Sequence, residues 1–115
     1  MCSPTWKRSS ILTTYDVIID PTGESDLRSI LRYISDTLLE PEIAKRIHLS
    51  IKEQINSLDQ IPYKHKLVPD EVLARRGIRA LYAENYCAFY VIEEPKKEVH
   101  VLRVQHKRRE WQSLL

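Results

Sequence analysis

The sequence contains little glycine, little cysteine and no long apolar segment. Glycine occurs only at positions 23 and 77, which excludes a phosphate-binding loop of the G-x-x-x-x-G-K or G-x-G-x-x-G kind. The two cysteines, Cys2 and Cys87, exclude a disulfide framework, and the four histidines are too dispersed for a zinc site. No run approaches the about 18 apolar residues of a membrane-spanning helix, and the first residues lack the apolar core of a secretory signal. We therefore expect a cytoplasmic protein with no cofactor, no metal and no membrane contact.

What the sequence does contain is typical of one globular domain. Its 115 residues are 43% hydrophobic and 30% charged, and a chain of this size buries roughly two thirds of its unfolded surface. The net charge of +2 is unevenly distributed. Residues 1–62 carry 7 basic against 9 acidic side chains, whereas residues 63–115 carry 11 against 7. The positive second half indicates an acidic partner, either nucleic acid or an acidic protein segment, with a merely solvated surface as the alternative.

The first half has the pattern of a strand followed by two helices. Residues 14–20 are rich in β-branched and aromatic side chains, which predicts a strand. Thr22 or Ser25 is then a suitable N-cap for a helix. Pro41 should end this helix and begin a second one, because proline is favoured at the first helical position. The two apolar stripes, with spacings of three and four residues, should pack on a sheet through Leu27, Ile30, Leu31, Ile34, Ile47, Ile51 and Ile55.

The second half changes to the period of β-strands. A loop over residues 60–70 contains the basic run Lys64-His65-Lys66, and residues 70–74 can form a helical turn. Three apolar or alternating runs, 78–82, 86–92 and 98–104, are then separated by segments that suit hairpin turns. Residues 107–115 are expected to form a short C-terminal helix. The predicted fold class is α+β with the order β-α-α-β-β-β(-α), a helical hairpin on one face of a small antiparallel sheet. Residues 1–12 are expected to be a flexible extension and residues 13–115 the domain.

Three segments of the second half have a familiar order and spacing. They are residues 76–81 (RGIRAL), 85–90 (NYCAFY) and 99–111 (VHVLRVQHKRREW). Together with the two predicted helices they resemble the RelE/ParE superfamily of bacterial toxins over roughly residues 13–115. The resemblance implies the toxin of a type II toxin–antitoxin module that arrests growth. It also implies a cognate antitoxin, which wraps an extended acidic segment around the toxin in a hetero-oligomer.

The superfamily has two main activities, and the resemblance leaves both open. RelE-like toxins cut messenger RNA in the ribosome without a metal, which needs proton transfer and cations against the charge of the transition state. The residues available for this chemistry are His106, Arg79, Arg103 and Arg109. Several groups that are usual in this nuclease class are replaced here, however. Cys87 stands where an arginine is usual, Arg79 is the sole basic residue of its strand, and Trp111 has no hydroxyl that could replace a catalytic tyrosine.

ParE-like toxins instead block DNA gyrase and need surface complementarity rather than catalytic groups. Because several groups of the nuclease class are replaced, the sequence slightly favours inhibition of DNA gyrase. The helical hairpin and the basic C-terminal segment would then be the interaction surfaces. The residues expected to bind the target or the antitoxin are Arg76, Arg79, Arg103, Lys107, Arg108, Arg109 and Trp111.

Overall fold

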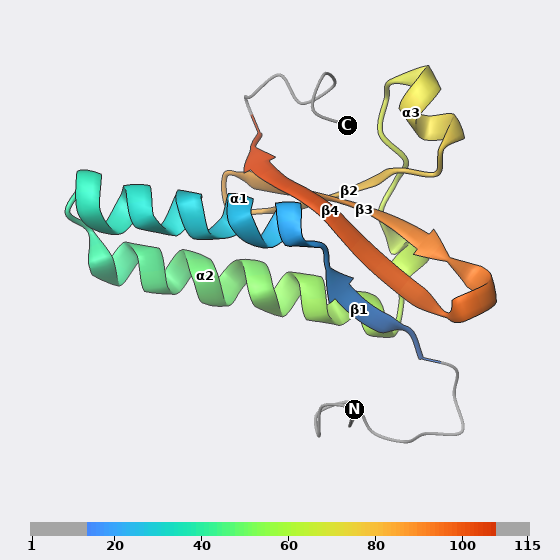
Figure 1. The fold of residues 1–115 in the computed structure, drawn as a ribbon, viewed down its shortest axis with the longest axis horizontal. Helices are drawn as coiled ribbons and strands as arrows, with labels where there is room; N and C mark the ends of the chain where they lie inside the picture. The colour runs from blue at the N-terminus through green and yellow to red at the C-terminus, as the bar shows by residue number, and fades with distance from the viewer. Residues whose placement is uncertain (1–13, 108–115) are drawn as a thin grey trace.

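A computed structural model describes residues 14–107, which form four strands and three α-helices (Figure 1). The elements are β1 (Asp16–Ile19), α1 (Pro21–Arg32), a π-helical segment (Tyr33–Thr37), α2 (Pro41–Asn56), α3 (Glu71–Arg75), β2 (Arg79–Ala83), β3 (Tyr86–Glu93) and β4 (Glu98–His106). None of the helices in this part of the chain has the length and apolarity that crossing a membrane requires. The predicted extension 1–12 and the predicted C-terminal helix lie outside the described residues, except for Lys107, which is in a turn.

The predicted α+β fold is confirmed, with α1 and α2 packed as a hairpin on a four-stranded sheet. The strand order is β1-β4-β3-β2, and the pairs β2–β3 and β3–β4 are antiparallel as expected. One detail differs, because β1 pairs parallel with β4 and the sheet is therefore mixed. The helical hairpin explains this arrangement. Helix α1 continues away from β1 and α2 returns, so the chain enters β2 in the same direction as β1. Two hairpin turns later, β4 has that direction as well (Figure 1).

The junction between β1 and α1 fixes the hairpin on the sheet. Helix α1 begins at Pro21, earlier than the caps expected at Thr22 or Ser25, because Asp20 in an extended conformation precedes a proline preset for the first turn. The side chain of Asp20 caps nothing and instead contacts His100 of β4. A Cβ on Gly23 would lie only 3.0 Å from the carbonyl oxygen of Val101. Glycine therefore allows the first turn of α1 to approach the backbone of β4.

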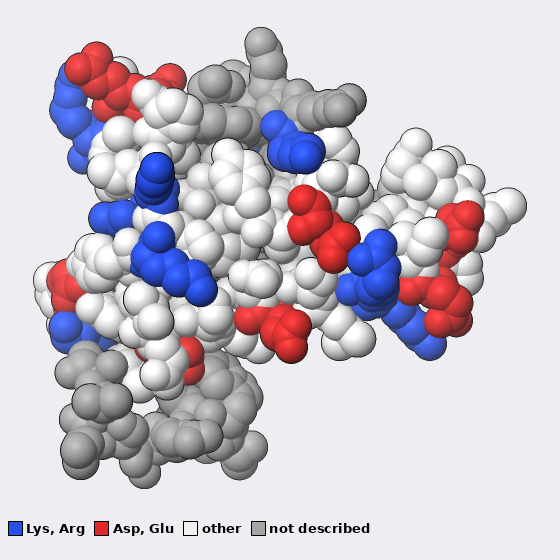
Figure 2. All heavy atoms as spheres, turned by 180° about the vertical axis from the view of Figure 1, so that it is seen from behind, with Lys and Arg blue, Asp and Glu red and all other residues white. Residues whose placement is uncertain are grey.

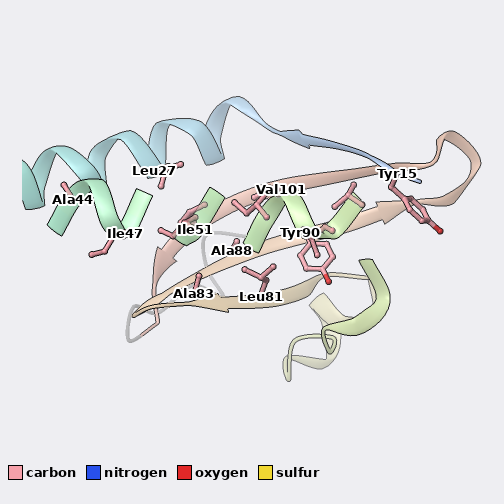
Figure 3. Packing of buried hydrophobic residues seen from close by; sticks show 14 of the residues in the cluster. Tyr15, Leu27, Ala44, Ile47, Ile51, Leu81, Ala83, Ala88, Tyr90 and Val101 are labelled. Atoms are coloured by element: carbon pink, nitrogen blue, oxygen red, sulfur yellow. The ribbon is translucent and has the colours of Figure 1, made fainter. Parts of the chain in front are cut away.

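The main core lies between the helical hairpin and the sheet (Figure 3). Five of the seven predicted contact residues are buried, whereas Ile30 and Leu31 are partly buried against the same cluster. Leu38 and Ile43 belong to the same apolar stripes, yet both are exposed at the end of the hairpin beyond the sheet. The buried cluster consists of Tyr15, Leu27, Ile34, Ala44, Ile47, Ile51, Ile55, Leu58, Leu81, Ala83, Ala88, Tyr90, Val99, Val101 and Val104.

A second, smaller cluster lies on the other face of the sheet, under α3. It consists of Val68, Leu73, Ile78, Ala80, Cys87 and Phe89. The helix α3 ends in a Schellman motif. The Ile78 N–H donates to the Leu73 carbonyl and the Gly77 N–H to the Ala74 carbonyl, with Gly77 at φ +83°. This motif turns the chain directly into β2 and so determines where Arg76 and Arg79 lie.

Candidate functional site

Arg79 lies at the start of β2, where the loop before α3 crosses the edge of the sheet. Its Nη1 donates a hydrogen bond of 2.7 Å to the His65 carbonyl oxygen. Its guanidinium carbon lies 5.0 Å from the centre of the Tyr63 ring, within the range of a cation–π contact. The side chain is partly exposed, so it is held in place by the loop while it still faces solvent.

Tyr63 is in turn held by a network around Glu94, in the turn between β3 and β4. The hydroxyls of Tyr63 and Tyr15 both donate to Oε2 of Glu94, and Nζ of Lys97 donates to Oε1 over 2.8 Å. Hydrogen bonds from Lys97, Tyr63 and Tyr15 lower the pKa of Glu94 to about 2. The carboxylate is therefore ionised at neutral pH, and it connects the start of β1, the loop that carries Tyr63 and the turn beside Lys97.

The basic run Lys64-His65-Lys66 does not present three side chains to solvent. The His65 ring packs edge-on against Tyr90, with centroids 6.4 Å apart, and its Nε2 is buried without a hydrogen-bond partner among the described residues. Burial, and secondarily the charge of Lys64, lower the pKa of His65, which favours the neutral imidazole. Only Lys64 and Lys66 are therefore available as cations in this run, and both are exposed.

Tyr90 anchors the same loop from the core side. Its hydroxyl donates a hydrogen bond of 2.6 Å to the Pro62 carbonyl oxygen. Burial raises the pKa of Tyr90 to about 12, so this phenol remains a neutral donor across the physiological range. The loop next to Arg79 is thus fixed by a buried hydrogen bond as well as by the strand edge.

Arg103 pairs with a carboxylate of the protein itself. Its Nε and Nη2 donate to the two oxygens of Asp26 on α1, over 2.7 and 3.0 Å, and the backbone N–H of Val104 adds a third bond of 3.1 Å to the same carboxylate. A bidentate pair of this kind fixes the orientation of the guanidinium group and is stronger than a single neutral hydrogen bond. The strand register shifts at this point, where Phe89 faces Arg103 but Tyr90 faces Val101. At this irregularity of β4, the side chain of Arg103 is directed toward Asp26 of the helical hairpin.

His106 ends β4 and is exposed. Its ring lies edge-on to Tyr86, with centroids 5.4 Å apart. A shallow apolar cavity of about 290 Å³ is lined by His106, Tyr86, Tyr33, Ile30 and Ser29. The next residue, Lys107, is exposed and its N–H donates to the Asn85 carbonyl. The remaining predicted residues of this basic segment, Arg108, Arg109 and Trp111, lie outside the described residues.

The structure does not bring the predicted acid–base and charge-stabilising groups together. His106 pairs with Tyr86, Tyr86 pairs with Ala83, and Arg79 lies at the opposite end of β2. With about 3.3 Å per residue and about 4.8 Å between strands, the backbones of Arg79 and His106 are on the order of 16 Å apart. Arg103 lies between them along the sheet, but it binds Asp26. Within the described part of the chain, these residues occupy three separate places.

Cys87 is a small buried residue. It packs in the cluster under α3 and lies opposite Tyr82 on β2 and Gln105 on β4. Burial raises the pKa of the Cys87 thiol to about 12, so the group is a neutral packing residue. The position at which the resemblance to the nuclease class would predict an arginine is thus held by a residue buried among apolar side chains.

On the face seen in Figure 2, the basic side chains of the described residues are scattered. Figure 2, which views the molecule from behind, shows separate basic side chains with acidic ones between them and an uncharged area in the middle. Arg76 follows α3 and is exposed, three residues before Arg79, and the loop that carries Lys66 pairs with the start of β2. No group of three or more histidine, cysteine, aspartate or glutamate side chains within residues 14–107 is arranged to hold a metal ion.

Two features were not anticipated from the sequence. The pairing of Arg103 with Asp26 joins positions 77 residues apart, and neither residue alone indicates it. The second feature is a groove of about 460 Å³ on the outer side of the helical hairpin, which several basic side chains line. Arg28 and Arg32 are four residues apart on one helix, a spacing that could have indicated a common positive face.

Comparisons with known proteins agree with the resemblance seen in the sequence. A chromosomal ParDE toxin–antitoxin structure from P. aeruginosa matches with a TM-score of 0.66 and 26% identity, covering 80% of this chain and 95% of that chain. The RelBE2 toxin–antitoxin complex from Mycobacterium tuberculosis matches with a TM-score of 0.57 and 22% identity, covering 83% and 93%, which indicates a shared fold. A search of curated proteins found no match. Residues 17–111 match the family described as the ParE toxin of the type II toxin–antitoxin system parDE. The chain therefore belongs to the ParE family of type II toxin–antitoxin toxins, within the RelE/ParE superfamily.

Proposed function

We propose that this toxin arrests growth in the cytoplasm by inhibiting DNA gyrase and that a cognate antitoxin neutralises it. The observation that carries the proposal is that the backbones of Arg79 and His106 are on the order of 16 Å apart. Proton transfer and charge stabilisation at one phosphate require groups within hydrogen-bond reach of the same few atoms. Because His106 is level with Ala83 at one end of β2 and Arg79 lies at the other end of that strand, binding to a protein target accounts for these groups better than joint catalysis does.

Two further observations support a binding function. Arg103 is held by Asp26 in a bidentate pair, so its charge is already compensated within the toxin. Cys87 is buried where a nuclease relative usually has an arginine. Both positions contribute to the stability of the fold, and inhibition by surface contact requires neither of them to react.

The antitoxin surface is proposed at the loop and strand that carry Lys64, Lys66, Arg76 and Arg79. Three of these four side chains are exposed, and Arg79 is held by Tyr63 and the His65 carbonyl. A groove of about 460 Å³ lies between this loop and β2, and Leu67, Ala80 and Tyr82 contribute its apolar lining. An extended segment with acidic and apolar side chains fits this combination of charge and apolar surface.

The proposal is tested by a paired assay with the purified toxin. The toxin is added to a gyrase supercoiling reaction and, at the same concentrations, to ribosomes programmed with messenger RNA. We expect loss of supercoiling with intact messenger RNA, and restored supercoiling when the co-expressed antitoxin is added. Cleaved messenger RNA with normal supercoiling would refute the gyrase proposal.

The second candidate function is ribosome-dependent cleavage of messenger RNA. One observation favours it, namely that His106 is exposed at the end of β4 and precedes the basic segment that begins at Lys107. A ribosome could supply the catalytic groups that the isolated toxin does not bring together. Under this alternative, His106→Gln should abolish cleavage in the programmed ribosomes, because general acid–base groups typically contribute about 10²–10⁴-fold in rate.

A further inference from the structure

The helical hairpin has a groove on the side that faces away from the sheet. This outer groove has a volume of about 460 Å³ and lies between the second half of α1 and the first half of α2. Its apolar lining comes from Leu31, Pro41 and Ala44. The full lining consists of Arg28, Leu31, Arg32, Ser35, Asp36, Pro41, Ala44, Lys45 and His48. The groove is thus an apolar strip with charged side chains along both edges.

The charges along the outer groove are mostly positive and not compensated. Arg28 and Arg32 line it from α1 and Lys45 from α2, whereas Asp36 is the single carboxylate in the lining. Among residues 14–107, none of these three cations forms an ion pair within 4.0 Å. Arg46, which lies on another side of α2, does form one, at 3.0 Å from Glu84. The positive charge of the groove is therefore available to a partner.

The apolar surface continues beyond the groove. Leu49 follows Lys45 by four residues, so it lies on the same side of α2, and it is 70% exposed. The buried face of α2 already contributes to the core of the toxin. Leu49 lies outside this face, so the core does not require it. It extends the apolar strip along α2 next to the basic edge.

We propose that the outer groove docks an acidic amphipathic α-helix of the toxin's protein target. This inference rests on the proposed function, since it assigns the target-binding surface of a toxin that acts by contact. Arg28 and Arg32 are about 6 Å apart along α1, and acidic residues four apart on a partner helix have the same spacing. Leucine-like side chains on the adjacent face would then enter the apolar strip between the two basic edges.

The dimensions and the lining favour a helix over a nucleic acid. A partner helix of three turns, about 16 Å long and 10 Å wide, occupies roughly 1,300 Å³. The groove can therefore take the side chains of one face but not the whole helix, as in other helix-in-groove interfaces. Nucleic acid would present its phosphates to the cations but would leave Leu31 and Leu49 without an apolar partner.

Peptide binding tests the outer groove directly and does not depend on toxicity. The probe is a labelled peptide of about 14 residues, four helical turns, with glutamate on one face and leucine on the opposite face. Its binding is measured by fluorescence anisotropy with the full chain, with Lys45→Glu and with the matched control Lys96→Glu. Both lysines are exposed, and Lys96 lies in the β3–β4 turn far from the groove. We expect Lys45→Glu to weaken binding about tenfold or more and Lys96→Glu to change it less than about twofold.

Three results would overturn the inference. They are no binding of the peptide to the full chain, equal binding to both variants, or tighter binding of a DNA duplex in its place with the same Lys45 dependence. Far-UV circular dichroism and thermal unfolding confirm that each variant is folded, as expected for exposed positions.

Assignment of the groove to the target is tested by growth arrest in cells. Lys45→Glu should relieve arrest while the variant still co-purifies with the co-expressed antitoxin, and Lys96→Glu should remain toxic. If Lys45→Glu loses peptide binding but still arrests growth, the groove is not the target surface. If the unchanged toxin fails to inhibit supercoiling, the gyrase proposal fails, whereas the peptide result on the groove is unaffected.

Discussion

The two faces of the sheet are covered in different ways. The hairpin of α1 and α2 covers one face with a cluster of fifteen buried residues that extends from Tyr15 to Val104. The other face is covered at β2 and β3 by α3 and its flanking loops, with a cluster of six. The larger cluster contains most of the buried side chains, so it should provide most of the stability. The smaller cluster positions a loop whose exposed basic and aromatic side chains can contact a partner.

The comparison also shows where charge is compensated. At the helical face, Arg103 and Asp26 pair with each other in a partly buried contact that holds α1 on β4. On the surface, a carbonyl and an aromatic ring orient Arg79, and no carboxylate within residues 14–107 forms an ion pair with it. Similar side chains therefore have different uses. Arg103 supports the fold, whereas Arg79 remains available for binding.

The largest effect is expected in the helical-face core. Ile51→Ala should lower the free energy of unfolding by about 2–5 kcal/mol, because the side chain is 1% exposed and its removal leaves a cavity. Urea unfolding measures this loss. The exposed Val72 of α3 serves as the control, and Val72→Ala should change stability by at most about 0.5 kcal/mol. Similar losses in both variants would show that the helical face is not the main source of stability.

The next effect is expected at the contact between α1 and β4. Asp26→Asn should cost about 1–3 kcal/mol, because it removes the charge opposite Arg103 and weakens three hydrogen bonds. Asp36→Asn, at an exposed position of the same helical hairpin, should cost at most about 0.5 kcal/mol. Equal urea midpoints for the two variants would contradict the assigned role of Asp26.

A smaller, pH-dependent effect is expected at His100. Its two ring nitrogens lie 3.0 Å from Asp20 and 2.9 Å from Glu98, and hydrogen bonds to these carboxylates raise the pKa of His100. Since the folded pKa is raised, the stabilisation is complete below the unfolded value near about 6.5 and is lost as pH rises through the folded value. Stability should fall by about 0.2–1 kcal/mol across this window, as for other partly exposed ion pairs. In His100→Gln, urea unfolding at a series of pH values should show no such step.

The smallest effect is expected on association, without a change in stability. Arg79→Ala should slow binding of the antitoxin, and the rate for the unchanged toxin should fall as salt rises past about 0.1 M, where the Debye length is about 10 Å. Stopped-flow measurements at two salt concentrations would test this. A rate independent of salt would remove the electrostatic part of the proposed antitoxin surface.

The fold was predictable because local signals agree with the tertiary contacts. The stripes of Leu27 and Ile51 face the sheet, and Pro41 begins the second helix as its position predicts. The parallel pairing of β1 with β4 was not predictable from local pattern, since it depends on how a hairpin of two helices reverses the chain. The exposure of Leu38 likewise follows from the length of the hairpin relative to the sheet and not from the period of the stripe.

The candidate site was less predictable than the fold. Residue type made Arg79 and His106 candidates, and both are at least partly exposed, but it could not show that His106 is level with the far end of β2 from Arg79. The inward orientation of His65 depends on Tyr90, which is 25 residues away in the chain. The outer groove depends on the side-by-side packing of two helices, and a single-helix pattern describes only one of its edges.

The most direct test of a contact mechanism is the toxicity of His106→Gln. This change keeps a similar polar shape but removes the group that could transfer a proton near neutral pH. Growth arrest and messenger RNA integrity are measured in cells that express each variant, and Arg109→Ala is compared in parallel as a change in the basic C-terminal segment. We predict that His106→Gln still arrests growth and leaves messenger RNA intact, whereas Arg109→Ala relieves arrest. A folded His106→Gln protein that no longer arrests growth, in cells where the unchanged toxin cuts messenger RNA, would contradict the account.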